Sequence, residues 1–171
     1  LYSLRVEYLD VVLFHRASDI IGNAGEALFD AIRTAQKLGR VGKVGVSIYS
    51  PQELDQVITK FFPECVQAPI NVFDRRMISS GWLGHLRREG IEVHARSLFL
   101  QGLLLMKASE RPEYFNRWRE DFEAYDDWVK GSGLHPVQAN IAYLSNIEEI
   151  DRVVVGVDSA EQLREIVAGV P

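Results

Sequence analysis

The chain has 171 residues, 47% of them hydrophobic and 25% charged, which is ordinary for a packed globular protein. Its net charge of −5 and its pI near 5.4 argue against nucleic acid as a partner, because phosphate binding needs clustered cations. There is no signal peptide and no run of 18 apolar residues, so nothing in the sequence indicates insertion into a membrane.

Five short apolar runs rich in β-branched residues predict buried strands at 11–14, 44–46, 65–68, 91–95 and 152–156. Between the first two runs, apolar residues at 28, 32, 35 and 38 have helical spacing, and Gly39 stands where a C-terminal cap belongs. Cys65, the only cysteine, lies in an apolar run, which predicts a buried and inert thiol. A chain without a possible disulfide fits a reducing cytoplasm.

Two helix starts carry a capping signature, Ser50-Pro51-Gln52-Glu53 and Ser159-Ala160-Glu161-Gln162. The long stretch before the last strand predicts an inserted helix at 113–129 and a crossover helix at 136–146. Four aromatic residues of the inserted segment 112–133 are spaced for one apolar helical face, and a lid, a partner surface or plain packing all remain open as its role: Trp118, Phe122, Tyr125 and Trp128.

The alternation of strands and helices predicts an α/β fold with parallel strands joined by right-handed crossovers. On pattern alone, a doubly wound sheet and an incomplete barrel are equally possible.

Three segments resemble the aldo-keto reductase family. Residues 8–15, which read Tyr-Leu-Asp-Val-Val-Leu-Phe-His, are similar to its fourth barrel strand, residues 42–50 to the fifth, and residues 67–76 to the sixth. Residues 97–103 and 156–165 fit the turns after the seventh and eighth strands. The resemblance implies that residues 1–171 form strands four to eight of a (β/α)₈ TIM barrel whose N-terminal half is absent. The missing initiator Met agrees with this interpretation as a fragment.

The resemblance also implies an oxidoreductase that reduces an aldehyde or ketone by hydride transfer from NADPH or NADH. It makes His15 the catalytic candidate, because His15 directly follows an apolar strand and barrel active sites lie at the C-terminal ends of strands. An ordinary polar residue opening a loop is the alternative for His15. The family's acid Tyr, with its Lys and Asp, belongs upstream, so we expect the isolated chain to be inactive. His94, inside a predicted strand, we interpret as a core histidine.

Cofactor contacts implied by the resemblance fall into two groups. Ser47 and Gln67 match residues that hold the nicotinamide carboxamide, although both would also suit buried polar groups bonded to neighbouring backbone. The second group fits the loops around the cofactor phosphates, where a helix N-terminus favours anions: Ser97, Gln101, Gly156, Ser159 and Gln162. Ser159 as a simple helix cap is the alternative.

Several residues depart from the family pattern. Ile48 replaces a usual Asn, which removes one carboxamide bond. Arg96 replaces the ring that stacks on the nicotinamide, so it would repel the oxidised cofactor, bind an anionic substrate or phosphate, or turn to solvent. Gln162 occupies a usually basic position, Ile166 replaces an Asn, and Asp158 adds negative charge, which leaves the choice between NADP and NAD open.

Three functions therefore compete. The first is a carbonyl reductase acting on a small-molecule substrate, without a metal. The second is a non-catalytic barrel that senses a cofactor or binds a partner, because Ile48, Arg96 and Ile166 erode the cofactor site. The third, an unrelated phosphate-binding barrel enzyme such as an isomerase, would need Lys or carboxylate bases at the strand ends, where His15, Ser47 and Gln67 stand instead.

Five strands cannot close an eight-stranded barrel, because strand number, tilt and shear are linked. We therefore expect open edges at the first and last strands and an apolar inner face exposed to water. Both features predict that the fragment self-associates.

Overall fold

The computed structural model describes residues 4–170 and contains one five-stranded parallel sheet. Its strands follow the chain order across the sheet: β1 (Leu9–Phe14), β2 (Val41–Ser47), β3 (Cys65–Pro69), β4 (Glu92–Arg96) and β5 (Arg152–Val153). A doubly wound sheet reverses its strand order at a switch point. The strand order here has no reversal, so the sheet is part of a barrel wall, and the α/β fold inferred from the sequence is confirmed.

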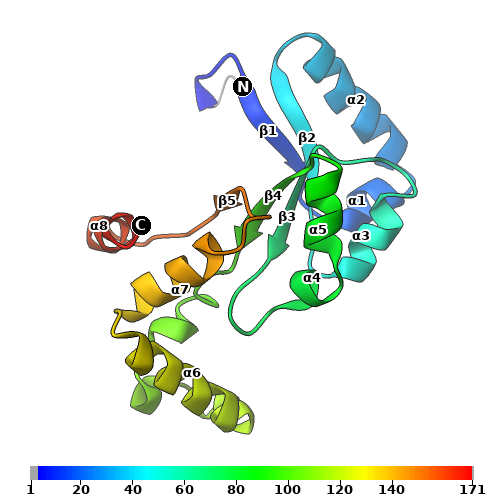
Figure 1. Cartoon of the computed structure of the whole chain (residues 1–171). Coiled ribbons are helices and arrows are strands. Elements are labelled where there is room, and N and C mark those ends of the chain that lie inside the picture. Colours follow the sequence, from blue (N-terminus) through cyan, green and yellow to red (C-terminus); the bar gives the residue numbers. More distant parts are fainter. Residues whose placement is uncertain (1–3, 171) are drawn as a thin grey trace.

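Eight helices follow the strands along the chain (Figure 1): α1 (Ala17–Ile21), α2 (Gly25–Lys37), α3 (Pro51–Val57), α4 (Arg76–Ser79), α5 (Trp82–Arg88), α6 (Arg119–Ser132), α7 (Pro136–Ser145) and α8 (Ala160–Ala168) within the described residues. Three 3₁₀ turns precede α6: η2 (Leu103–Leu105), η3 (Ala108–Glu110) and η4 (Glu113–Trp118). Figure 1 shows α1 to α5 grouped on one side of the sheet, while α6, α7 and α8 extend from its other end.

Both predicted capping signatures form. The Ser50 hydroxyl accepts a hydrogen bond from the Glu53 N–H at 3.3 Å, and the Ser159 hydroxyl accepts one from the Gln162 N–H at 3.2 Å. Gly39 takes a φ of +68° just after α2, as expected of a helix-ending glycine. These polar side chains replace intrahelical partners that the first turn of a helix lacks.

The main core lies between the sheet and the helices that cover it. Val44, Val46, Val66 and Val93 are fully buried on that face of the sheet, and each contributes about 1.5–3 kcal/mol by leaving water. The buried side chains of Leu54, Val57, Leu83 and Leu86, from α3 and α5, pack in the same cluster. This layer holds the strand ends in place.

The opposite, inner face of the sheet is polar around β4, whereas Val11 and Leu13 of β1 keep its first edge apolar, so the expectation of an apolar inner face is wrong in part. Alternate residues of β4 point to this face, and they are Glu92, His94 and Arg96. Lys43 of β2 and Arg152 of β5 both contact Glu92, so the charges neutralise one another across the sheet. The apolar pattern of the strands had suggested two apolar faces, but only the helix-covered face is apolar throughout.

Two local expectations also need correction. The predicted strand at 152–156 pairs only over Arg152–Val153, because no sixth strand lies beside it in the described residues. The helix predicted from residues 28–38 forms as α2, in which Ile32 and Ala35 pack against the core, whereas Leu28 and the C-cap Leu38 are 44% and 64% exposed. The inserted segment divides into η4 and α6, and of its four aromatic residues Phe122 and Tyr125 are buried while the two Trp residues are partly exposed.

Candidate functional site

Four polar residues lie in one row at the C-terminal end of the sheet. The strand register pairs Ser47 with Gln67 and Gln67 with His94. Since Phe14 pairs with Val46, the next residue, His15, lies level with Ser47. His15 itself is exposed and follows the last residue of β1. The three residues proposed from the sequence to contact substrate and nicotinamide therefore come from three adjacent strands.

Ser47 and Gln67 interact directly. The Ser47 hydroxyl donates to the Gln67 side-chain oxygen at 3.4 Å, and Ser47 is only 5% exposed. Gln67 lies in the middle of β3 rather than at its end, because the strand continues to Pro69. The side-chain amide nitrogen of Gln67 has no hydrogen bond to another residue within 4–170, so it is available to a carbonyl oxygen of a ligand.

Arg96 reaches across β3 from the end of β4 and is half-buried rather than turned to solvent. Its guanidinium donates to the Ile48 carbonyl oxygen at 3.1 Å and to the Ser97 hydroxyl at 3.2 Å, and it lies 4.4 Å from the centre of the Tyr49 ring. Ile48 is fully buried, so its side chain offers nothing to a ligand. One face of the Tyr49 ring is thus covered by a cation, in the geometry of a cation–π contact.

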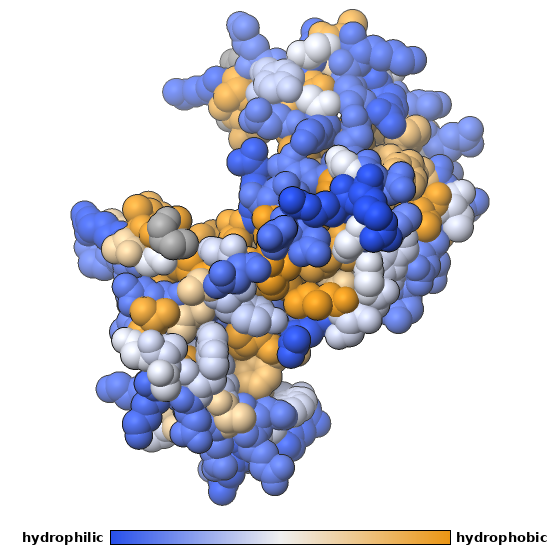
Figure 2. Space-filling view, viewed as in Figure 1, coloured by the Kyte–Doolittle hydropathy of each residue, from blue (hydrophilic) through white to orange (hydrophobic). Residues whose placement is uncertain are grey.

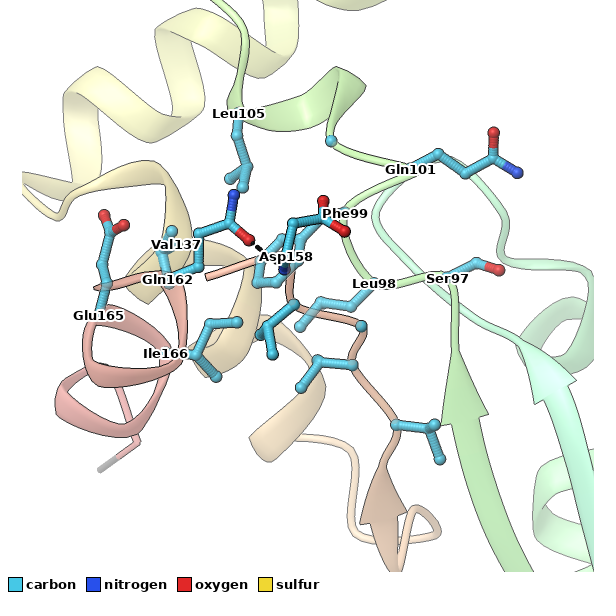
Figure 3. A pocket seen from close by; sticks show the side chains of 15 residues that line it. Ser97, Leu98, Phe99, Gln101, Leu105, Val137, Asp158, Gln162, Glu165 and Ile166 are labelled. Atoms are coloured by element: carbon cyan, nitrogen blue, oxygen red, sulfur yellow. Dashed lines mark hydrogen bonds between the residues drawn. The ribbon is translucent and has the colours of Figure 1, made fainter. Parts of the chain in front are cut away.

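A cavity of about 590 Å³ opens beside this row, between the loop after β4 and the N-terminal end of α8. Four of the residues proposed for the cofactor phosphates line it, namely Ser97, Gln101, Gly156 and Gln162. Figure 3 shows Gln162 and Asp158 together on the α8 side, while the Ser97 and Gln101 side chains point away from them. The volume is within the usual range of small-molecule and cofactor sites.

The N-terminal end of α8 is occupied by its own side chains. Ser159 caps the helix and does not line the cavity, and the Gln162 side-chain oxygen accepts the Asp158 N–H at 2.7 Å. The charged residues that line the cavity are Asp158 and Glu165, both acidic. This end of the cavity therefore carries negative charge, and none of its lining residues is a cation.

Asn71 organises the two loops beside the row, and it was not singled out from the sequence. It is fully buried, donates to the Ser97 carbonyl oxygen at 3.1 Å, and accepts the N–H groups of Phe73 and Asp74 at 2.9 and 2.8 Å. An Asn in the turn after a strand, here two residues beyond the end of β3, commonly forms such an Asx turn, and its position was the available signal in the sequence. The loop after β4 is strained, because Ser97, with a φ of +62°, and two further non-glycine residues adopt positive φ.

Glu92 is the centre of the charged group on the inner face. Its carboxylate is 11% exposed and accepts hydrogen bonds from Lys43, from Arg152 at 2.8 Å and from the His94 ring at 2.7 Å. The bond from Lys43, followed by those from His94 and Arg152, lowers the pKa of Glu92 to about 2. His94 is thus a partnered core histidine, as predicted.

Burial raises the pKa of Cys65 to about 12, which agrees with an inert thiol.

The structure brings the predicted site residues together as two groups. His15, Ser47 and Gln67 lie level with one another on three adjacent strands, whereas Ser97, Gln101, Gly156 and Gln162 line the cavity. Arg96 connects the groups through its bond to Ser97. Ser159 is the exception, since it serves as the α8 cap.

Within residues 4–170, no group of three or more His, Cys, Asp or Glu side chains is arranged to hold a metal ion. The same part of the chain contains no helix that is both long and apolar enough to span a membrane.

Comparison with curated proteins finds similar reductases. The chain is 26% identical to an L-glyceraldehyde 3-phosphate reductase of Escherichia coli O157:H7 over an alignment of 195 residues, covering 96% of this chain and 54% of that protein. The L-glyceraldehyde 3-phosphate reductase of Escherichia coli strain K12 is 24% identical over the same shares. The chain thus spans about half the length of these relatives.

Solved structures show the same fold. An aldo-keto reductase of Bacillus halodurans in its holo form matches 99% of this chain with 55% of its own, at a TM-score of 0.75 and 17% identity. A thermostable aldo-keto reductase solved with the inhibitor epalrestat matches at a TM-score of 0.67 and 22% identity, with 57% of its own chain. The family model described as "Aldo/keto reductase family" matches residues 1–170. The chain belongs to the aldo/keto reductase family.

Proposed function

We propose that the protein carrying this chain reduces the aldehyde or ketone group of a small molecule with NADH or NADPH. The observation that carries the proposal is the row of His15, Ser47 and Gln67 across three adjacent strands, level with the C-terminal ends of β1 and β2, together with a cavity of about 590 Å³ beyond the end of β4. Polar residues at the C-terminal ends of barrel strands are where such folds place their chemistry. We assign the cytoplasm as the location, because the single cysteine is a free, buried thiol.

The residues present fit a nicotinamide dinucleotide in part. The free amide nitrogen of Gln67 and the Ser47 hydroxyl suit a carboxamide, whereas buried Ile48 contributes no side-chain hydrogen bond. Ser97, Gln101 and Gly156 line a cavity of suitable volume for the adenosine part. A cofactor held at these residues supplies a hydride to the carbonyl carbon.

His15 acts on the carbonyl oxygen. Its imidazole donates a hydrogen bond that strengthens as negative charge develops on that oxygen, which lowers the barrier. The family's Tyr, Lys and Asp have no match in these 171 residues. We therefore ascribe turnover to the full-length protein and expect the isolated chain to be inactive.

The cavity favours NADH over NADPH. Asp158 and Glu165 line it, and the Gln162 side chain is already bonded to the Asp158 backbone. A 2′-phosphate placed near these two carboxylates is repelled, whereas a 2′-hydroxyl is not. A cation for the extra phosphate is missing from the lining residues.

The proposal is tested by titrating NADH into the full-length protein, with calorimetry, and by following NADH consumption with a panel of aldehydes. Ser47→Ala and Gln67→Leu each remove a carboxamide contact and are expected to weaken NADH binding about tenfold. A tenfold loss of affinity corresponds to about the net free energy of one hydrogen bond between neutral groups, or slightly more. Ser145→Ala, an exposed serine at the end of α7, is the matched control. Unchanged NADH affinity in both site variants would refute the assignment of Ser47 and Gln67.

A non-catalytic barrel that senses cofactor is the second candidate. The buried Ile48 and the covered face of Tyr49 favour it, because both reduce what the site offers to a nicotinamide. A full-length protein that binds NADH tightly but oxidises none of it with any aldehyde would establish the sensor and exclude the reductase.

A further inference from the structure

Three arginines within residues 4–170 are half-buried, and only one of them lacks a carboxylate partner. Arg33 contacts Glu64 at 3.3 Å, and Arg111 contacts Asp126 at 2.8 Å. Arg96 has no carboxylate oxygen within 4 Å among the residues that the structure describes. A half-buried guanidinium without a counter-ion is electrostatically uncompensated, since burial weakens its hydration.

The contacts of Arg96 hold it without neutralising it. A guanidinium has five N–H donors, and Arg96 uses one on the Ile48 carbonyl oxygen and one on the Ser97 hydroxyl. Both acceptors are neutral, and so is the Tyr49 ring on which the group lies. The remaining N–H donors make no hydrogen bond to another residue of 4–170.

Asp74 is near enough for the charge of Arg96, after the hydrogen bonds from Arg76, to help lower the pKa of the Asp74 carboxyl, but the nearby carboxylates are bonded to other groups. Asp74 accepts two hydrogen bonds from the Arg76 guanidinium, at 2.9 and 2.7 Å. Glu53 accepts the backbone N–H of Tyr49 at 2.7 Å. Neither is free to rotate toward Arg96 without losing these partners, so the charge of Arg96 remains available to a ligand.

Arg96 also lies at the C-terminal end of the sheet, where the proposed carbonyl site is. It pairs in register with Pro69 at the end of β3, two residues beyond the level of Gln67 and His94. Its guanidinium reaches the carbonyl oxygen of Ile48, the residue that directly follows Ser47 at the end of β2. The cation therefore stands above the strand ends that carry the proposed carbonyl site.

We propose that Arg96 binds the negatively charged group of an anionic carbonyl substrate, a carboxylate or a phosphate. This inference rests on the proposed reductase function, because the substrate is assumed to occupy the strand ends. Arg96 offers a planar pair of donors that matches either anion. The anion replaces the missing counter-ion and holds the substrate at one end, so that a short chain places the carbonyl near His15.

The test measures binding of non-reducible probes to the full-length protein by calorimetry. Glycerol 3-phosphate is compared with glycerol, and succinate with succinamide, so that the two arms separate phosphate from carboxylate recognition. Arg96→Met removes the charge and keeps much of the volume, Arg96→Lys keeps the charge without the planar donors, and Arg75→Met alters an exposed arginine as the control. Thermal melting verifies that each variant is folded.

We expect one anion to bind at least about tenfold more tightly than its neutral analogue, and Arg96→Met to remove that advantage. Arg96→Lys should retain part of it, and Arg75→Met all of it. A folded Arg96→Met that binds the anions as the unaltered protein does would overturn the inference, and so would an unaltered protein that prefers neither anion. If the proposed reductase function itself were wrong, a different measurement would show it, because NADH would not be oxidised with any aldehyde, charged or neutral.

Discussion

At the scale of single residues, Glu92 decides the electrostatics of the inner face of the sheet. One carboxylate accepts hydrogen bonds from Lys43, His94 and Arg152, which come from three different strands. Removing its charge leaves Lys43 and Arg152 without their shared anionic partner. We predict that Glu92→Gln lowers the free energy of unfolding of the full-length protein by about 1–3 kcal/mol at neutral pH, measured by urea denaturation.

The pH dependence follows from the pKa of Glu92, which its three donors lower to about 2 from 4.5. The stabilisation is fully present above the unfolded value near 4.5 and is lost as the pH falls through about 2. Glu92→Gln should therefore flatten the loss of stability between these two pH values. Glu123→Gln, an exposed carboxylate of α6, should leave the acid profile unchanged. Identical acid profiles for both variants would show that the charged group contributes nothing.

We propose that Asp158 and Glu165 determine the choice between NADH and NADPH. Both line the cavity, and no lining residue is a cation. We predict that the full-length protein binds NADH at least as tightly as NADPH, and that Asp158→Asn combined with Glu165→Lys shifts the ratio of the two dissociation constants about tenfold toward NADPH. Calorimetric titration with each cofactor measures this ratio. A preference of the unaltered protein for NADPH above about a hundredfold, or about 2.7 kcal/mol, would contradict the assignment.

At the scale of helices and strands, the two capping serines offer a clean comparison. Ser50 begins α3 inside the main core layer, where Leu54 and Val57 are buried, whereas Ser159 begins the exposed α8. We predict that Ser50→Ala lowers the free energy of unfolding by about 0.5–2 kcal/mol, because the Glu53 N–H loses the Ser50 hydroxyl and keeps only the Ser50 carbonyl oxygen, at 3.2 Å, as acceptor. Ser145→Ala is the control, and an effect of Ser50→Ala on urea denaturation no larger than that of Ser145→Ala would argue against a cap at Ser50.

The sequence predicts the positions of strands and helix starts well, because these depend on neighbouring residues. Ser50 and Ser159 cap helices as expected, and all five strands lie at the predicted runs. Local sequence patterns do not predict contacts between residues that are far apart in the chain. The contact of Lys43 with Glu92 spans β3, and that of Arg96 with Ile48 does so too, so neither follows from spacing along the chain.

The candidate site, like the fold, could be predicted from the sequence only in part. His15, Ser47 and Gln67 stand out as polar residues in or after apolar strands, and the structure places them side by side. Asn71 and Tyr49 escaped notice because their roles depend on loops that meet only in the folded chain. The alternation of Glu92, His94 and Arg96 along one strand was the visible sign of a polar inner face.

At the scale of the whole molecule, the sheet has open edges. β1 and β5 each have one neighbouring strand, and Leu163, Val167 and Val170 of the α8 segment are between 48% and 63% exposed. Figure 2 shows apolar residues as a band across the middle of this face, over the segments near β4 and β5. Unpaired strand edges and apolar patches favour association.

We therefore predict that the isolated 171-residue chain self-associates, through the strand edges and α8 rather than through the polar inner face. A stable interface of this kind buries well over about 1,000 Å². Light scattering coupled to size exclusion should give a mass above 19.4 kDa at micromolar concentration. A monomer of that mass that melts cooperatively would contradict the prediction.

The central claim, that His15 acts on a carbonyl oxygen beside a bound nicotinamide, is tested most directly by single-turnover oxidation of NADH. The full-length protein is loaded with NADH and mixed rapidly with aldehyde, and the decay of cofactor absorbance is compared with that of His15→Ala. We predict that the variant binds NADH with unchanged affinity and turns over at least about a hundredfold more slowly, because the developing negative charge loses its hydrogen-bond donor. An unchanged single-turnover rate in His15→Ala would contradict the account and leave His15 as an exposed loop residue.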